Sequence, residues 1–411
     1  MASRTHANTI WGITLLAAAM LMMTMGARQT MGLFVAPINS TTGLGLANIS
    51  LAMAVAQFVW GAIQPIAGAA ADRYGHERVL IIGVLVLALG SAITPFMTTT
   101  WGLIFSIGLL SAAGSGAGSF SVLIGAVAQR LPAEKRGMAS GVINAGGSFG
   151  QFVFAPLLQK LITMFGWMGA MYSLAVIVLA ALPIGWKLRN PPTAAAAGTS
   201  TAGAIPLKDS GLKAALIDSL KNPSYLLLHA GFFTCGFHIA FLVTHLPGEV
   251  RLCGLSEQVA SWSIAIIGLF NIAGSLLAGW GVQYYRSKYL LVWLYGSRAL
   301  MIAIYLVAPK TELTFYVFAA VLGLTWLATV PPTAAVVGKL FGTRYLATLF
   351  GLTLLSHQTG AFFGAWLGGI AVVEWGNYDS MWYADIALAA AAAICNLPIR
   401  EARIVPVLKP A

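Results

Sequence analysis

Two arginines, Arg28 and Arg298, lie inside long apolar stretches of this sequence, where a charged side chain is costly. A guanidinium does not lose its proton, so in hydrocarbon it must face an aqueous cavity, an anion or a carboxylate. The planar fork of Arg28 would suit bidentate binding of a carboxylate ligand. The alternative is a structural pair with an acidic residue, but Asp385 is the one acidic residue clearly inside an apolar stretch.

Three other polar residues in apolar stretches could carry a proton, namely His238, His357 and Asp385. Histidine titrates near neutral pH, and a buried carboxyl can be brought into the same range. For each histidine the alternative is a neutral ring bonded to a backbone carbonyl. Residue counting separates Arg298 and Asp385 by roughly 9 Å in depth, so we expect them to form a structural or coupling ion pair, with substrate binding as the alternative.

The elements that must position these residues are apolar stretches of membrane-spanning length. About 20 helical residues cross a hydrocarbon core of about 30 Å. The sequence predicts twelve such helices, at 10–37, 48–70, 79–98, 101–128, 138–160, 167–186, 223–246, 258–280, 289–308, 312–338, 346–372 and 380–399.

Lysines and arginines concentrate on one side of these spans. With the N-terminus in the cytoplasm, eighteen of the 23 basic residues face that side, whereas Lys160, Arg251 and Lys310 face the other. The positive-inside rule therefore predicts a multi-pass inner membrane protein with both termini cytoplasmic. The net charge of +11 follows the loops and forms no continuous basic face, so no nucleic acid partner is expected. The three cysteines show neither disulfide nor metal spacing, and no cofactor is expected.

The two halves of the chain resemble each other at a fixed offset of 210 residues. The matched residues are Gly26, Arg28 and Pro37 with Gly236, His238 and Pro247, and Gly141 and Gly150 with Gly351 and Gly360. The polar connector contains NPPTAAAAGTSTAG, a flexible linker composition. We predict an all-α membrane protein of two pseudo-symmetric bundles, comprising an N-terminal six-helix bundle at 1–186, a cytoplasmic linker at 187–222 and a C-terminal six-helix bundle at 223–411. Arg28 and His238, as repeat partners, should face one central cavity.

Residues 68–78, GAAADRYGHER, resemble the loop between helices 2 and 3 of major facilitator superfamily transporters, with one residue more before the last arginine. The resemblance implies the major facilitator fold, with substrate held between the halves. Asp72, Arg73 and Arg78 would then act in gating, because an acidic residue at a helix end can cap a neighbouring helix and pair with arginines. The second half has Gln283 where a charge might be, so this latch is asymmetric.

The sequence GARQTMGLF in helix 1 is similar to that of the monocarboxylate transporter family and its bacterial relatives, in which a basic residue of helix 1 helps to bind the carboxylate. Arg28 occupies that position. Helix 8 departs from the family pattern, because Asn271 fits the first polar position but Ser275 replaces the arginine one turn later. Because of this departure, the resemblance predicts neither lactate as the substrate nor the family's coupling mechanism. The expected substrate-binding residues, on cavity-facing stripes of helices 1, 5, 7, 8 and 11, are Arg28, His238, Asn271, Asn144, Gln151 and His357.

These observations predict a secondary active transporter that moves small organic anions (monocarboxylates) by proton symport and alternating access. Its partners would be a small organic carboxylate, a proton and membrane lipid, and it is expected to be a monomer. His238, Asp385 and Arg298 are the expected proton-coupling residues. The alternative is an organic anion exchanger of the oxalate–formate type, which needs no proton site. Export of cationic drugs would favour carboxylates inside the membrane, and the scarcity of acidic residues in the spans argues against it. A membrane enzyme is not expected, because no catalytic motif occurs in the structural context that it needs.

Overall fold

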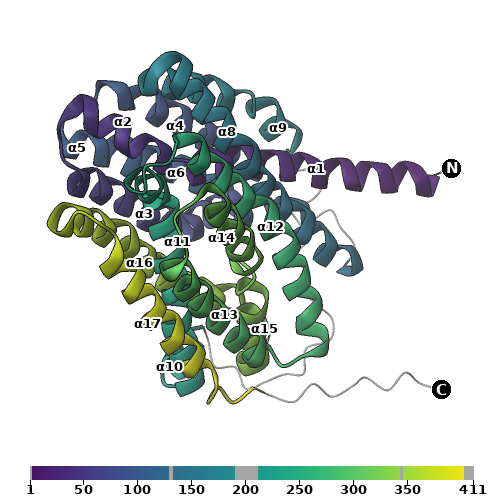
Figure 1. The fold of residues 1–411 in the computed structure, drawn as a ribbon. Coiled ribbons are helices and arrows are strands. Elements are labelled where there is room, and N and C mark those ends of the chain that lie inside the picture. The colour runs from purple at the N-terminus through teal and green to yellow at the C-terminus, as the bar shows by residue number, and fades with distance from the viewer. Residues whose placement is uncertain (1, 129–132, 190–211, 343–345, 402–411) are drawn as a thin grey trace.

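The computed structural model describes residues 2–128, 133–189, 212–342 and 346–401, and every regular element in these ranges is a helix (Figure 1). Nine segments of this part are long and apolar enough to cross a membrane. One of them, 141–187, turns at Gly166 (φ 69°) and holds two crossings. With α16 (Leu346–Trp375) and α17 (Asp379–Asn396), the spans number twelve. The predicted architecture of two six-helix bundles is confirmed.

The first half contains spans 1 to 6. Several of these spans are assembled from more than one helical segment. Span 1 is α1 (Ala2–Gln29) with α2 (Gly32–Thr42), span 2 is α3 (Leu46–Tyr74), and span 3 is α4 (His76–Ile93) with the 3-10 turn η1 (Thr94–Phe96). Span 4 has four parts: α5 (Thr100–Leu103), the π-helix η2 (Ile104–Ser111), α6 (Ala112–Ala117) and α7 (Phe120–Ala128). Spans 5 and 6 are α8 (Ala133–Leu179) with α9 (Leu182–Lys187).

The second half contains spans 7 to 12. They are α11 (Pro223–Leu252), α12 (Glu257–Tyr284), α13 (Ser287–Val307), α14 (Glu312–Thr325) with α15 (Val330–Phe341), α16 and α17. Asn222 starts α11 by accepting from the Ser224 amide (2.9 Å), with proline in the first helical position. The predicted linker, 187–222, contains the short helix α10 (Leu212–Leu220), and its residues 190–211 lie outside the described part. The bundle boundaries therefore stay a prediction.

Because twelve is an even number of crossings, α1 begins and α17 ends on the same side, called here the terminal side. The opposite side is called the distal side. In Figure 1 the start of α1 lies at the right, whereas α2 and α5, which belong to the distal side, lie at the left.

Four spans in the described part are interrupted, which hydropathy does not reveal. Span 1 breaks at Thr30–Met31, span 4 at Gly118–Ser119, span 6 at Ala180–Ala181 and span 10 at residues 326–329. The breaks in spans 4 and 10 coincide at the repeat offset of 210. Irregular backbone at membrane depth needs partners within the protein. The hydroxyl of Thr24 donates to the Gly118 carbonyl (3.0 Å), and the Asn271 side-chain oxygen accepts from the Leu327 amide (3.0 Å).

The repeat also appears in helix packing. A side chain at Gly150 of α8 would collide with the Met22 carbonyl of α1, and one at Gly360 of α16 would collide with the Phe233 carbonyl of α11. Glycine thus allows the same close approach in both bundles.

The two halves meet through α3 against α16 and α8 against α12. Gln151 donates to the Ile264 carbonyl (3.0 Å), and Gln159, nearer the distal side, donates to Glu257 (2.8 Å). At the distal ends of α3 and α16, Ser50 packs directly against Gly369. These contacts run from the middle of the molecule to the distal side.

Candidate functional site

Arg28 lies near the end of α1, two residues before the break of span 1. One Nη of its guanidinium donates to the side-chain oxygen of Gln57 on α3, and its Cζ lies 4.1 Å from the centroid of the Trp60 ring. The residue is partly buried. The ion pairs found in the described part of the chain do not include it. Arg28 is therefore a cation at membrane depth that is held by an amide and an aromatic ring.

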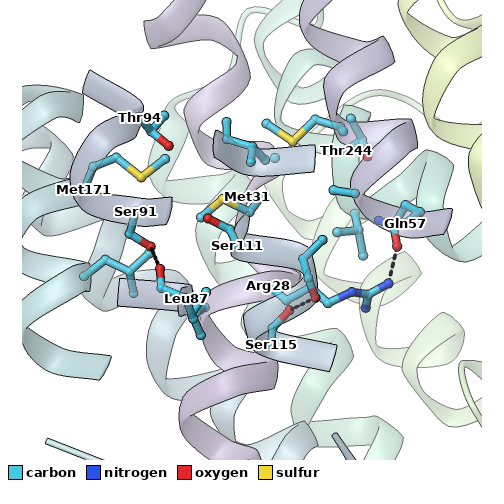
Figure 2. A pocket seen from close by; sticks show the side chains of 18 residues that line it. Arg28, Met31, Gln57, Leu87, Ser91, Thr94, Ser111, Ser115, Met171 and Thr244 are labelled. Atoms are coloured by element: carbon cyan, nitrogen blue, oxygen red, sulfur yellow. Dashed lines mark hydrogen bonds between the residues drawn. The ribbon is translucent and has the colours of Figure 1, made fainter. Parts of the chain in front are cut away.

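A small cavity of about 30 Å³ adjoins Arg28 (Figure 2). Since a water molecule needs roughly 10–15 Å³, this conformation leaves room for about two. Val243 and Thr244 of α11 close the cavity from the second half. Figure 2 shows the guanidinium pointing toward Gln57 and away from Ser115. The hydroxyls that line the cavity belong to Ser91, Thr94, Ser111, Ser115 and Thr244.

His238 lies elsewhere, inside the C-terminal bundle. Its Nδ1 bonds to Oδ2 of Asp385 on α17, and both side chains are fully buried. This corrects the expectation that Arg28 and His238 share one cavity. Val243 and Thr244, which do reach that cavity, follow His238 by five and six residues. At about 100° per residue they point to the opposite face of the helix.

Arg298 is also fully buried. The sequence led us to expect an ion pair with Asp385, but the structure gives Arg298 other partners. One Nη donates to the Thr325 and Trp326 carbonyls (2.6 and 3.2 Å), at the point where α14 ends and span 10 breaks. A helix C-terminus presents unsatisfied carbonyls and a partial negative charge, so it attracts a guanidinium. Asp385 meanwhile pairs with His238. Counting residues along helices gives depth but not the direction in which a side chain points.

The polar residues of spans 5 and 8 join the two halves. Asn271 is fully buried and donates to the Ser148 hydroxyl on α8 (2.9 Å), and its oxygen accepts from the span 10 break. Gln151, one turn from Ser148, is fully buried and bonds to α12. Asn144 is partly buried and lies one turn before Ser148. None of the predicted residues Asn144, Gln151 and Asn271 lines the Arg28 cavity in this conformation.

His357 and Gln358 are adjacent on α16, and their side chains are hydrogen bonded to each other (3.3 Å). The charges of both Arg28 and Arg298 act on the His357 ring. Gln358 packs against Gly61 of α3, one turn after Gln57. The His357 backbone carbonyl abuts Gly236 of α11. Spans 2, 7 and 11 thus connect the surroundings of Arg28 to those of His238.

The predicted gating residues lie at the terminal end of α3. Gly75 separates α3 from α4 with φ 99°, a conformation that favours glycine and so accounts for the glycine of this motif. Arg73 is exposed, with its Cζ 5.2 Å from the centroid of the Tyr74 ring, and Arg78 is exposed. The side chain of Asp72 lies outside the described part, so the latch stays a prediction.

Sequence reasoning missed three side chains. Gln57 and Trp60 hold Arg28, and their signal was a glutamine one turn before a tryptophan within an apolar span. Glu249 is buried in the last turn of α11, where it accepts a hydrogen bond from the Tyr305 hydroxyl (2.6 Å). It was missed because the predicted span ended at residue 246, whereas the helix runs to Leu252.

Known proteins resemble the chain over most of its length. It is 26% identical over 376 residues to the oxalate:formate antiporter of Oxalobacter formigenes (89% of this chain, 86% of the relative). It is 27% identical over 357 residues to monocarboxylate transporter 13 of Rattus norvegicus (85% of this chain, 78% of the relative). Among solved structures, a D-xylose-proton symporter shares the fold with a TM-score of 0.71 at 16% identity, covering 95% of this chain and 98% of that one.

The family model described as Major Facilitator Superfamily matches residues 14–353 and 252–408. Together these ranges include every span described above, from the body of α1 to the end of α17. The chain is a membrane transporter that belongs to the major facilitator superfamily, as the loop at 68–78 predicted.

Proposed function

We propose that this transporter moves small organic anions, specifically monocarboxylates, and that Arg28 binds the carboxylate. The observation that carries the proposal is a guanidinium at membrane depth without a carboxylate among its partners in the described residues. The N-terminus of α2, at Gly32, lines the same cavity, and its dipole also favours an anion. The relatives named for oxalate, formate and monocarboxylates support this substrate class.

The transport cycle in this proposal is alternating access. The contacts between the halves near the distal side, such as Gln159 with Glu257, would part while the terminal side closes. A cavity of about 30 Å³ is too small for a carboxylate, so the site must widen when substrate enters. Asp72, Arg73 and Arg78 would then latch the terminal side. The distribution of basic residues supports an inner membrane orientation with this side in the cytoplasm.

Coupling to protons is the finer part of the proposal. Arg28 cannot titrate, so a symporter needs a second group whose protonation is linked to anion binding. His238, His357 and Asp385 are the candidates. The exchanger alternative, supported by the oxalate:formate relative, needs no such group.

One experiment tests both the site and the coupling. Purified protein in liposomes is given a labelled monocarboxylate, with either an inward proton gradient or unlabelled anion inside. Symport predicts uptake that collapses with the proton gradient, whereas exchange predicts uptake that requires the internal anion.

The uptake rate of the Arg28→Ala variant should be about 10- to 100-fold lower than that of the parent in either assay, because a charge-assisted contact with the carboxylate is removed. Arg28→Lys should regain little, since an ammonium lacks the bidentate fork. Arg251→Ala, at an exposed arginine of α11, is the control and should transport like the parent. Normal uptake by Arg28→Ala protein would move the anion site elsewhere.

A further inference from the structure

Four buried residues surround the break of span 10 and form what we call the break cluster, His238, Asp385, Arg298 and Trp326. They come from α11, α17, α13 and the break itself. The His238 and Trp326 ring centroids lie 5.8 Å apart, and Arg298 donates to the Trp326 carbonyl (3.2 Å). The four side chains are fully buried. The cluster is closed to lipid and to both membrane faces in this conformation.

The cluster keeps polar atoms without hydrogen-bond partners in the described part of the chain. These are Nε2 of His238, Oδ1 of Asp385, Nε and Nη1 of Arg298 and Nε1 of Trp326. A native interior leaves few such atoms, and concentrations of them mark functional sites. The bonded pair of His238 and Asp385 keeps one carboxylate oxygen and one imidazole nitrogen without partners. Both groups can bind a proton.

We propose that the His238–Asp385 pair binds the co-transported proton and that the break in span 10 responds to it. The inference rests on the proposed function, because it assumes a carboxylate at Arg28. When the pair carries no extra proton, Asp385 is a negative charge close to the Arg298 guanidinium. The charges of Asp385 and Arg298 both act on His238. A proton shared by the pair cancels that charge. Arg298 must then rely more on the Thr325 and Trp326 carbonyls, which define the break.

Other titratable and charged groups lie near the pair. Arg298 on α13 acts on His238 directly. Tyr295 on α13 and His357 on α16 lie within range of the Arg298 charge, and Cys235 on α11 lies near Tyr295. None of these combines a carboxylate with an imidazole. A proton on His357 would add a third positive charge within range of Arg28 and Arg298, whereas a proton on His238 has the Asp385 carboxylate beside it.

A packed route links the pair to Arg28. Gly236, two residues before His238, abuts the His357 carbonyl of α16. The next residue, Gln358, packs on Gly61, one turn from the Gln57 that holds Arg28. Both arginines act on His357, so an anion at Arg28 reduces the positive field across this region. Anion and proton should therefore bind in a mutually favourable way, as symport requires.

The test separates coupling from substrate movement in liposomes. Asp385→Asn and His238→Gln should keep exchange of labelled for unlabelled monocarboxylate. With a gradient of one pH unit, one-to-one symport can raise the ratio of internal to external substrate to about tenfold. In the two variants this ratio should fall to about one. In detergent, monocarboxylate affinity should weaken with rising pH in the parent and become flat in both variants.

Matched controls lie on α11 itself. His245 bonds to the Ala365 carbonyl (2.7 Å), and Glu249 bonds to Tyr305, both buried and outside the break cluster. His245→Gln and Glu249→Gln should accumulate substrate like the parent. If Asp385→Asn does not fold, Asp385→Glu and His238→Gln still test the idea, through a shifted and a lost pH dependence.

The outcomes are distinguishable from failure of the proposed function. Parent-like accumulation by both His238→Gln and Asp385→Asn would overturn the proton site while leaving anion transport at Arg28 intact. Carboxylate transport by Arg28→Ala protein would instead overturn the proposed function. Loss of exchange together with accumulation, in folded variants, would show a substrate role for the pair and would also overturn the inference.

Discussion

The buried charges that the structure describes in the C-terminal bundle have partners of different kinds. Arg298 uses backbone carbonyls, Asp385 uses an imidazole, Glu249 uses a tyrosine hydroxyl, and Glu401 uses an ammonium and two backbone amides. Arg28, in the N-terminal bundle, uses an amide oxygen and an indole face. Burying a charge is tolerated only with such compensation. The partners of Arg28 are both uncharged, so an anionic substrate would improve its compensation.

At the residue scale, Glu401 gives a prediction outside the spans. It follows α17 and accepts from the Ser287 and Lys288 amides at the start of α13 (3.0 and 2.9 Å), and it pairs with Lys339. Burial would raise the pKa of Glu401, but Lys339 and the two amides outweigh it, so the pKa is lowered. A lowered pKa stabilises the fold at pH values above the unfolded pKa, and the gain is lost as pH falls through the folded value.

Glu401→Gln should therefore cost about 1–2 kcal/mol at pH 7 and progressively less below about pH 4. Thermal unfolding of detergent-purified protein at several pH values measures this. Glu312→Gln, at an exposed glutamate that begins α14, should change little at any pH. An equal cost for Glu401→Gln at all pH values would show that the carboxylate charge is not what matters.

At the scale of elements, the sequence predicts the spans well and their interruptions poorly. Hydropathy and loop charge are local properties, so twelve spans could be located from them. The break at Gly118–Ser119 depends on a hydroxyl from α1, and the break in span 10 depends on Arg298 and Asn271 from two other helices. Such partners come from tertiary packing. The same limit explains why Asp385 was given the wrong partner.

The repeat supplies a prediction for helix packing, with internal controls. Gly150 and Gly360 meet backbone carbonyls of the neighbouring helix, whereas Gly141 and Gly351, on the same two helices, have open space around them. Gly150→Ala and Gly360→Ala should each destabilise the protein by about 1–3 kcal/mol through overpacking. Gly141→Ala and Gly351→Ala should be neutral or slightly stabilising, since alanine favours helix. Melting temperatures of the four variants decide it, and equal effects at all four positions would contradict it.

At the scale of the whole molecule, the halves pack closely through α3 against α16 and α8 against α12, and side-chain hydrogen bonds cross this boundary. Within the N-terminal half, Trp167 donates to the Thr41 hydroxyl (2.8 Å) near the distal side. Between the halves at a similar level, Gln159 donates to Glu257 (2.8 Å). The sequence places these residues near span ends, but it does not say which of them contact each other. That depends on how the bundles dock.

These two pairs allow a test of whether the halves separate during transport. In a variant without Cys235, Cys253 and Cys395, the pair Gln159→Cys with Glu257→Cys is joined by a short thiol-specific crosslinker. Alternating access requires this contact to part, so crosslinked protein should lose nearly all uptake in liposomes and regain it when a cleavable linker is reduced. The pair Thr41→Cys with Trp167→Cys lies within one bundle and should keep transporting after crosslinking. Undiminished uptake with Gln159→Cys and Glu257→Cys fully joined would mean that the distal side stays closed throughout the cycle, and the rocking of two rigid bundles would have to be abandoned.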